Sequence, residues 1–247
     1  DSQLQDPKYS KNPLKLTIDL SIQAAVEHVL EGGMRLLNAK GAAAILMEVE
    51  TGRIISLASL PDFDPNHRPK LPSRGSAAES PLFNKAIQGV YELGSTFKIF
   101  TVAQALELGL VDPKTKINTK GPIRIGGHKI NDYRSNGPEL PVWEIITESS
   151  NLGTARIAKM IGPEKQREFL SSLGFSKPTT IEMIEANGGK PLLPKRWNEL
   201  ETMTISYGHG LSATPLHLAT GYATLANGGR LVNPTLLQEV KPVLGPR

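Results

Sequence analysis

Hydrophobic residues recur every three or four positions in several stretches of the chain, and this spacing predicts amphipathic helices. The first helix is expected to begin after Asp19, a favourable N-cap residue, and to bury the face that carries Ile22, Val29 and Leu37. A second helix is expected from Ser95 to about Gly109. Four more are predicted for the stretches "PVWEIITES", "LGTARIAKMIG", "PEKQREFLSSLGF" and "TPLHLATGYATLANGG".

Strands are predicted where apolar residues alternate or run together between turn signals. "LKLTIDL" is expected to form a short strand that ends at Asp19, and residues 42–59 predict a β-hairpin with both strands substantially buried. "IRIGGHKI" predicts a tight hairpin that turns at Gly126–Gly127. Residues 61–79, rich in Pro, Ser, Gly and charge, are expected to form an exposed loop. Helices combined with hairpins indicate an α/β (α+β) domain.

Composition and charge narrow the function classes. The 247 residues, 39% of them apolar, are enough for a globular core, and no stretch has the uninterrupted apolar length of a membrane span. The net charge is +4, but the basic residues are scattered and no recognition motif occurs, so nucleic acid is not expected as a partner. There is no cysteine, which excludes disulfides and thiol nucleophiles. The five histidines lack metal-binding spacing, so neither a metal nor another cofactor is expected.

The candidate chemistry begins at "YELGSTFK", where Ser95 is the one serine followed three positions later by a lysine. Residues three apart on a helix share a face, so Lys98 can reach Ser95. Lys98 activates the hydroxyl only as a neutral amine, and keeping it neutral at pH 7 costs about 4.6 kcal/mol unless its pKa is lowered. This hypothesis therefore requires a buried, electropositive pocket. The alternative is that Ser95 caps the helix and Lys98 lies on its solvent face.

A Ser-x-Asn triplet is the second motif, and the chain contains two of them, Ser10-Lys11-Asn12 and Ser149-Ser150-Asn151. Neither triplet is specific by itself. Only the second follows the Ser-x-x-Lys motif and falls between two predicted helices, 54 residues after Ser95. Order and placement therefore favour the triplet at 149–151.

The two motifs resemble two of the three active-site boxes of penicillin-binding proteins. The chain is similar to class B, cell-division-type transpeptidases from about residue 14 to 238, in the stretches "TIDLSIQ", "TGRIISLASLPDFDPN", "YELGSTFK", "TESSN" and "YGHGLSATPLHLATGYATLANGG". The resemblance implies the penicillin-binding-protein and serine β-lactamase-like fold. In this fold helices flank a central antiparallel sheet, and an all-helical subdomain is expected at about 92–227. Residues 1–13 are then an extended lead-in to a transpeptidase domain over 14–247.

The resemblance also assigns roles to individual residues. It implies that Ser95 attacks the bond between two terminal D-alanines of a peptidoglycan stem peptide, or a β-lactam ring, and forms an acyl-enzyme. Lys98 is then the base, Ser149 a relay hydroxyl, and Asn151 a donor to the amide carbonyl of the substrate, while Ser150 points elsewhere. The backbone N–H of Ser95 is expected to stabilise the oxyanion. The same resemblance places the glycine-rich turn around His209 near the cleft, with a structural role for this histidine.

The sequence departs from the family pattern because it contains no Lys-Thr-Gly or Lys-Ser-Gly box. In relatives this box supplies a cation, a carboxylate anchor and a second oxyanion donor, and losing one such donor lowers the rate about 10²- to 10³-fold. The printed chain is therefore expected to be impaired. The C-terminal strands of the sheet are expected to be missing as well, which leaves the hairpin at 42–59 with an open edge.

The expected function is peptidoglycan D,D-transpeptidation in septal cell-wall synthesis during cell division. Expected partners are stem peptides, β-lactam antibiotics, a membrane cell-wall polymerase and division proteins. The expected location is the periplasmic, extracytoplasmic face of the cell membrane, through an N-terminal anchor outside this chain. The alternatives are a serine β-lactamase or D,D-carboxypeptidase of the same fold, and a non-catalytic β-lactam sensor.

Overall fold

The structure is a computed structural model that describes residues 14–70 and 76–238, so the expected lead-in at 1–13 lies outside the described residues. The chain divides into two compact units. The first contains the chain up to Tyr91, Leu173–Pro191 and the part from Ala213 onward, and the second contains Glu92–Ser172 and Leu192–Ser212. The main elements of the first unit are α1 (Leu20–Leu37), β1 (Ala42–Met47), β2 (Ile54–Leu60), 3₁₀ turns at Pro65–His67, Ala77–Glu79 and Ile184–Gly188, and α7 (Pro215–Ala226).

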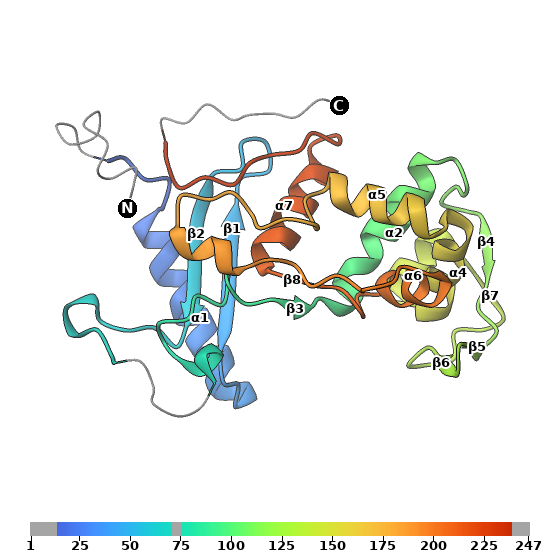
Figure 1. Cartoon of the computed structure of the whole chain (residues 1–247), viewed down its shortest axis with the longest axis horizontal. Helices are drawn as coiled ribbons and strands as arrows, with labels where there is room; N and C mark the ends of the chain where they lie inside the picture. The colour runs from blue at the N-terminus through green and yellow to red at the C-terminus, as the bar shows by residue number, and fades with distance from the viewer. Residues whose placement is uncertain (1–13, 71–75, 239–247) are drawn as a thin grey trace. The chain divides into compact units, whose positions relative to one another are not determined.

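The β1–β2 hairpin lies between α1 and α7 (Figure 1). The two strands pair antiparallel from Ala42 opposite Leu60, with an irregularity after Leu46, which confirms the predicted hairpin. Its inner face contributes to an apolar cluster around Ile54, Ile87 and Leu216. Among the described residues β1 pairs with β2 alone, so its other edge is open, as expected.

The start of the chain differs from the prediction. "LKLTIDL" forms no strand within its described residues but a single bridge from Leu16 to Leu237, supported by a hydrogen bond from the Thr17 N–H to the Leu236 carbonyl. Pairing does not continue because the partner segment is itself irregular. Asp19 does cap α1, since its carboxylate accepts hydrogen bonds from the N–H groups of the second and third residues after it.

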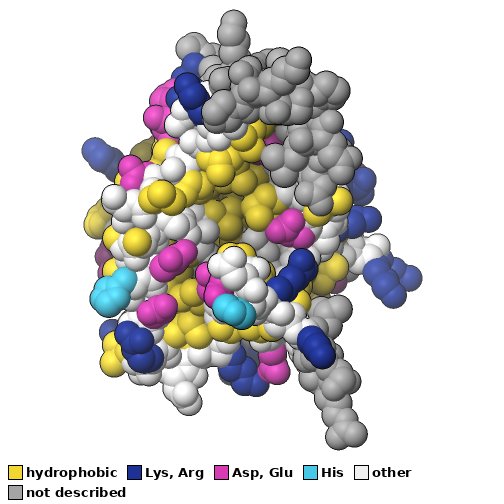
Figure 2. Space-filling model, turned by 90° about the vertical axis from the view of Figure 1, so that its left-hand side faces the viewer, with side chains coloured by type: hydrophobic (Ala, Val, Ile, Leu, Met, Phe, Trp, Pro, Cys, Tyr) yellow, Lys and Arg dark blue, Asp and Glu magenta, His cyan; other side chains and the backbone are white. Residues whose placement is uncertain are grey.

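The prediction that α1 buries its apolar face is wrong for the described residues. No residue of α1 is buried, and Val29 and Leu37 are 71% and 77% exposed. The described hairpin has only two strands, which is too narrow a surface to cover the apolar side of an 18-residue helix. Figure 2 shows hydrophobic side chains gathered on this side of the first unit. The exposed large hydrophobic residues of α1 are Leu20, Ile22, Val29, Leu36 and Leu37.

The second unit is mainly helical but not all-helical, which corrects the expected subdomain. It holds two small antiparallel sheets, β4 with β7 and β5 with β6, and the β5–β6 hairpin turns at Gly126–Gly127 as predicted. Its elements are a 3₁₀ turn η3 (Gly94–Phe97), α2 (Lys98–Glu107), β4 (Lys116–Asn118), β5 (Ile123–Ile125), β6 (His128–Ile130), β7 (Glu139–Pro141), α3 (Val142–Thr147), α4 (Asn151–Ile161), α5 (Pro163–Ser172) and α6 (Glu199–Ile205). Two short strands, β3 (Tyr91–Glu92) and β8 (Ser212–Ala213), lie where the chain passes from one unit to the other.

The expected subdomain boundary at residue 227 also differs from this division. Helix α7 and the segment Leu173–Pro191 belong to the first unit. The physical reason is packing, because Leu216 of α7 and Ala186 of the segment are buried in the same apolar cluster as Ile54 of β2.

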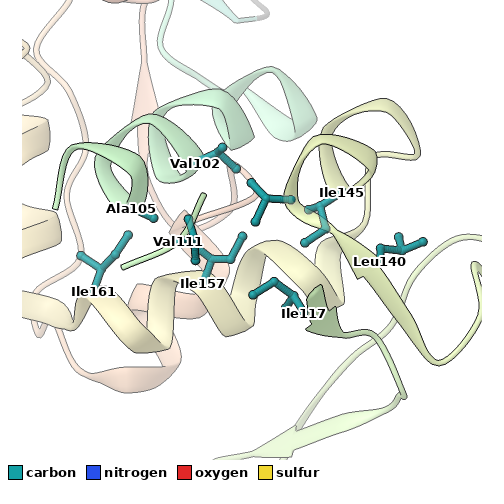
Figure 3. Close-up of a cluster of buried hydrophobic side chains, with 9 residues drawn as sticks. Val102, Ala105, Val111, Ile117, Leu140, Ile145, Ile157 and Ile161 are labelled. Atoms are coloured by element: carbon teal, nitrogen blue, oxygen red, sulfur yellow. The ribbon is translucent and has the colours of Figure 1, made fainter. Parts of the chain in front are cut away.

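The core of the second unit forms where α2, α3 and α4 meet (Figure 3). Ile145 and Ile157 are fully buried there, and Ala105 of α2 leaves room for close helix packing. The sequence analysis missed α6, although Asn198 and Glu201 form a complete capping box at its start. This core holds the two helix N-termini that carry the candidate motifs, α2 with Lys98 and α4 with Asn151.

Candidate active site

Ser95 lies in the 3₁₀ turn η3, immediately before α2. Its side chain is exposed and makes no hydrogen bond to the described residues, while its carbonyl accepts the Lys98 N–H. The N-cap positions of η3 and α2 are Leu93 and Phe97, and neither turn has a side-chain cap. The structure therefore excludes the alternative that Ser95 caps the helix, and its hydroxyl is free to act elsewhere.

Two glycines hold the backbone just before this serine. The Gly94 N–H donates to the Gly208 carbonyl at 3.1 Å, and both residues have positive φ angles, +57° and +84°. A Cβ atom added to Gly208 would lie 2.1 Å from the Gly94 carbonyl oxygen, a distance that no real side chain tolerates. The turn at 207–210 is thus packed directly against the segment that presents Ser95. The turn at 207–210 was expected near the cleft from the family resemblance, but the contact of this glycine pair was not predicted, because the two residues are far apart in the chain.

The ammonium group of Lys98 is enclosed rather than solvated. Lys98 is 2% exposed, and its Nζ donates to the Ser149 hydroxyl at 2.8 Å and to the Ser149 carbonyl at 2.5 Å. Burial lowers its pKa to about 8, while the negative charge of Asp132 acts in the opposite direction. A lysine with this pKa is neutral in about a tenth of the molecules at pH 7. The burial that the Ser-x-x-Lys hypothesis requires is therefore present, but the charge that acts on the amine is the negative one of Asp132 and not the expected positive one.

The candidate residues are brought together unequally. Lys98 and Ser149 are in direct contact, although 51 positions separate them. No hydrogen bond links the Lys98 amine to the Ser95 hydroxyl. The two residues are connected only through the backbone of one helical turn. The Asn151 side chain donates to the Asn131 carbonyl at 3.1 Å, which uses one of its two amide protons.

Ser149 is presented by a strained turn. It has a φ of +54°, one of two positive φ angles among the described non-glycine residues, and its side chain is exposed. The next residue, Ser150, is fully buried and caps α4, because its hydroxyl accepts the Gly153 N–H at 2.9 Å. Ser150 is thus buried, whereas Ser149 is exposed and Asn151 is half-buried.

The sequence analysis also missed Asp132, whose carboxylate accepts a hydrogen bond from the Ser150 hydroxyl at 2.7 Å.

Within the described residues no group of three or more His, Asp or Glu side chains is placed to hold a metal ion. A search of the same residues for a helix long and apolar enough to cross a membrane found none.

Comparison with known proteins assigns this arrangement to a family. Residues 42–244 match the family model described as the penicillin binding protein transpeptidase domain. The probable peptidoglycan D,D-transpeptidase FtsI of Caulobacter vibrioides is 34% identical over 234 residues, which are 95% of this chain and 38% of that protein. The corresponding FtsI of Escherichia coli K12 is 32% identical over 229 residues, covering 93% and 37%. The chain thus spans less than two fifths of the length of these relatives.

Solved structures agree. The apo transpeptidase domain of penicillin-binding protein 3 from Burkholderia pseudomallei has a TM-score of 0.79 and 30% identity, covering 98% of this chain and 66% of that one. A peptidoglycan glycosyltransferase from Burkholderia ambifaria gives the same TM-score at 29% identity, covering 93% of this chain and 68% of that one. These comparisons confirm the predicted fold class. The relatives from Caulobacter vibrioides and Escherichia coli both carry the name of a peptidoglycan D,D-transpeptidase.

Proposed function

We propose, from the premise that this chain belongs to the penicillin-binding protein transpeptidase domain family, that it catalyses peptidoglycan D,D-transpeptidation through an acyl-enzyme on Ser95. The observation that carries the proposal is the contact of the buried Lys98 amine with the Ser149 hydroxyl at 2.8 Å, one turn after Ser95. A lysine whose pKa is lowered toward neutrality is what activation of a serine hydroxyl requires.

In the first half-reaction, the Ser95 Oγ attacks the carbonyl carbon of the penultimate D-alanine. An ester bond forms as the amide bond to the terminal D-alanine breaks. Neutral Lys98 takes the proton from the Ser95 hydroxyl, and the Ser149 hydroxyl passes a proton to the leaving amine. The hydrogen bond from the Lys98 amine to the Ser149 hydroxyl supports this relay, because Ser149 is already placed to accept a proton from Lys98.

The other groups bind and orient the substrate. The N–H of Ser95 donates to the oxyanion that develops on the attacked carbonyl. The amide proton that Asn151 keeps free donates to a carbonyl of the stem peptide. In the second half-reaction the amine of another stem peptide attacks the ester and forms the cross-link. Its proton returns through Ser149 and Lys98 to the Ser95 oxygen, which restores the enzyme.

The setting of the reaction follows from the substrate and from the resemblance to FtsI-named relatives. Peptidoglycan lies outside the cell membrane, so we place the chain at the periplasmic, extracytoplasmic face, held by an N-terminal anchor outside the printed residues. The reaction is then part of septal wall synthesis, next to a membrane cell-wall polymerase and division proteins. β-Lactams react at the same serine because their ring mimics the D-alanyl-D-alanine bond.

A fluorescent penicillin tests the proposal directly. The protein is incubated with the compound and analysed by gel fluorescence and by intact-mass spectrometry. We expect a long-lived covalent adduct that Ser95→Ala abolishes and that forms slowly, because this sequence lacks the Lys-Thr-Gly box and its second oxyanion donor. Thr96→Ala is a matched control, because this neighbouring hydroxyl is exposed and donates to the nearby Leu93 carbonyl at 2.6 Å.

Each outcome of this experiment separates the candidate functions. Rapid release of hydrolysed penicillin would point to a β-lactamase, and an adduct that persists in Ser95→Ala would assign the nucleophile elsewhere. If no adduct formed on the unchanged protein, acylation by this chain would be contradicted. With a stem pentapeptide that ends in D-alanyl-D-alanine, we expect release of D-alanine and transfer to an added amine rather than to water.

A further inference from the structure

The carboxylate of Asp132 is bound to the start of α4 through both of its oxygens. Oδ2 accepts a hydrogen bond from the Ser150 hydroxyl at 2.7 Å, and Oδ1 accepts one from the Leu152 N–H at 2.9 Å. Asp132 follows β6, whose last residue, Ile130, is 4% exposed and packs with Leu152 in one apolar cluster. The carboxylate is therefore anchored from a separate element that is itself fixed by the core.

This contact completes the hydrogen bonding of the turn at 149–151. The Ser150 hydroxyl donates to Asp132 and accepts from the Gly153 N–H, and the Ser150 carbonyl accepts from the Thr154 hydroxyl at 2.6 Å. On the other side of the turn, both oxygens of Ser149 face the Lys98 amine. Ser149 keeps its unfavourable φ of +54° only because bonds on both sides hold it.

We propose that Asp132 is a positioning residue that holds the Ser149 hydroxyl against the Lys98 amine. The proposal rests on the proposed function, since it matters for catalysis only if Lys98 and Ser149 move the proton. It deepens that function by assigning a role to a residue outside the family motifs.

Asp132 also acts on Lys98 through its charge. Burial lowers the pKa of Lys98, and the negative charge of the Asp132 carboxylate raises it. Removing the charge while keeping an oxygen acceptor therefore lowers the pKa of Lys98 further. Removing the Ser150 hydroxyl breaks the link to the turn but leaves the charge. The two roles can thus be separated by variants.

The test compares the variants Asp132→Asn, Asp132→Ala and Ser150→Ala with the unsubstituted protein. The control is Asp112→Asn, an aspartate of the same unit whose Oδ1 accepts the Lys114 and Thr115 N–H groups at 2.7 and 3.0 Å. The pKa of Lys98 is followed by NMR on protein labelled with ¹³C at lysine Cε, with Lys98→Arg assigning the signal. We expect a lower pKa in both Asp132 variants and no decrease in Ser150→Ala or Asp112→Asn.

The positioning role is measured on acylation by penicillin at a pH where Lys98 is neutral in every variant. We expect the rate to fall about 10²-fold in Asp132→Ala, as it does for a misplacement of about 1 Å, and to fall in Ser150→Ala as well. Asp112→Asn should keep the rate. Circular dichroism checks that each variant is folded. If Asp132→Ala does not fold, Asp132→Asn is used in its place, because its amide oxygen can still accept the Leu152 N–H.

One further readout requires no acylation, so failure of the proposed function and failure of this inference are distinguishable. Leu152 is at the second position of α4, where its N–H has no acceptor within the helix, and Asp132 supplies the bond. We expect hydrogen exchange at this amide to speed up in Asp132→Ala and not in Asp112→Asn. If this exchange and the pKa of Lys98 were both unchanged in Asp132→Ala, the inference would be overturned, whether or not penicillin reacts.

Discussion

Two buried lysines, one in each compact unit, differ in what surrounds their ammonium groups. Lys85 in the first unit is 7% exposed, and its Nζ has no hydrogen-bond partner among the described residues. Lys98 in the second unit is 2% exposed, and its Nζ donates to both oxygens of Ser149. Burial lowers the pKa of both. Desolvation alone therefore perturbs a lysine, whereas a proton relay also needs oxygen atoms placed beside the amine.

The surroundings of Lys85 make the contrast clear. It lines a cavity of ≈ 350 Å³ together with Gly41 and Tyr91, beside the exposed ion pair of Lys40 with Glu79 at 3.0 Å. A Cβ atom added to Gly41 would lie 2.4 Å from Cε of Lys85, so the lysine stem packs tightly on the backbone there. No serine hydroxyl is bonded to its amine among the described residues. A lowered pKa at this site is a consequence of packing.

The strongest way to break the comparison is to replace each lysine by methionine, which has a similar length and no charge. We expect Lys98→Met to slow penicillin acylation of Ser95 by about 10³-fold, because a positioned general base contributes about 10²- to 10⁴-fold. Lys85→Met should leave the rate almost unchanged. The measurement is the rate of adduct formation by mass spectrometry. If the acylation rate fell equally in Lys98→Met and Lys85→Met, Lys98 would have no special role in acylation.

A second test changes the backbone next to Ser95 while both lysines stay in place. Gly208→Ala puts a methyl group 2.1 Å from the Gly94 carbonyl oxygen, so the segment that carries Ser95 must shift. We expect acylation to fall about 10²-fold.

Gly210→Ala is the matched control for this change. Its φ of +82° is almost the same, but its nearest neighbour would be the Thr204 hydroxyl at 3.4 Å. Both variants carry similar backbone strain, and only Gly208→Ala displaces the serine. If Gly210→Ala lost as much acylation activity as Gly208→Ala, general strain would explain the effect and the glycine contact would not.

The pH dependence of acylation sharpens the comparison further. Because the neutral amine of Lys98 is the base and its pKa is about 8, we expect the second-order rate constant to rise about tenfold per pH unit below pH 8 and to level off above it. In Lys85→Met the same profile should be found. A profile that is flat from pH 6 to 9 would contradict Lys98 as the base.

The smallest expected effect concerns stability. Lys85→Met removes a buried charge without a partner, and we expect the free energy of unfolding at pH 7 to rise by about 1 kcal/mol or more, measured by urea denaturation. Its folded pKa is lowered, so the unfolded chain binds more protons between that pKa and about 10.4, and stability rises with pH in this range. Lys85→Met should flatten that rise. An unchanged slope would mean that Lys85 is solvated in solution.

The elements predicted correctly have their signals within a few residues. The cap at Asp19, the hairpin at 42–59 and the turn at Gly126–Gly127 need only local hydrogen bonds and backbone geometry. The prediction failed for the buried side of α1 and for the strand at "LKLTIDL", because both depend on what another part of the chain places beside them. Periodicity indicates which face of a helix is apolar, but not whether a surface exists to cover it.

The candidate site divides in the same way. The motifs located Ser95, Lys98 and Ser149, and the structure brings two of these three into contact. Asp132 was missed, and of Gly208 only its turn was expected near the cleft, because an aspartate after a hairpin and a glycine in a turn are common. Their roles depend on contacts with residues 18 or more positions away. Each residue has one local signal in the sequence. Asp132 follows closely after the predicted hairpin, and Gly208 belongs to the repeated glycines of "YGHG".

The sequence by itself determined the reactive groups, the order of the motifs and the family, because these depend on residue types and on spacing along the chain. Tertiary structure alone decided that the Lys98 amine is enclosed by Ser149, that Ser95 caps no helix, and that Lys85 is buried without such oxygens. Desolvation and hydrogen bonding act through space, so the pKa of a lysine depends on its neighbours in the folded structure. These neighbours cannot be identified from their separation along the chain.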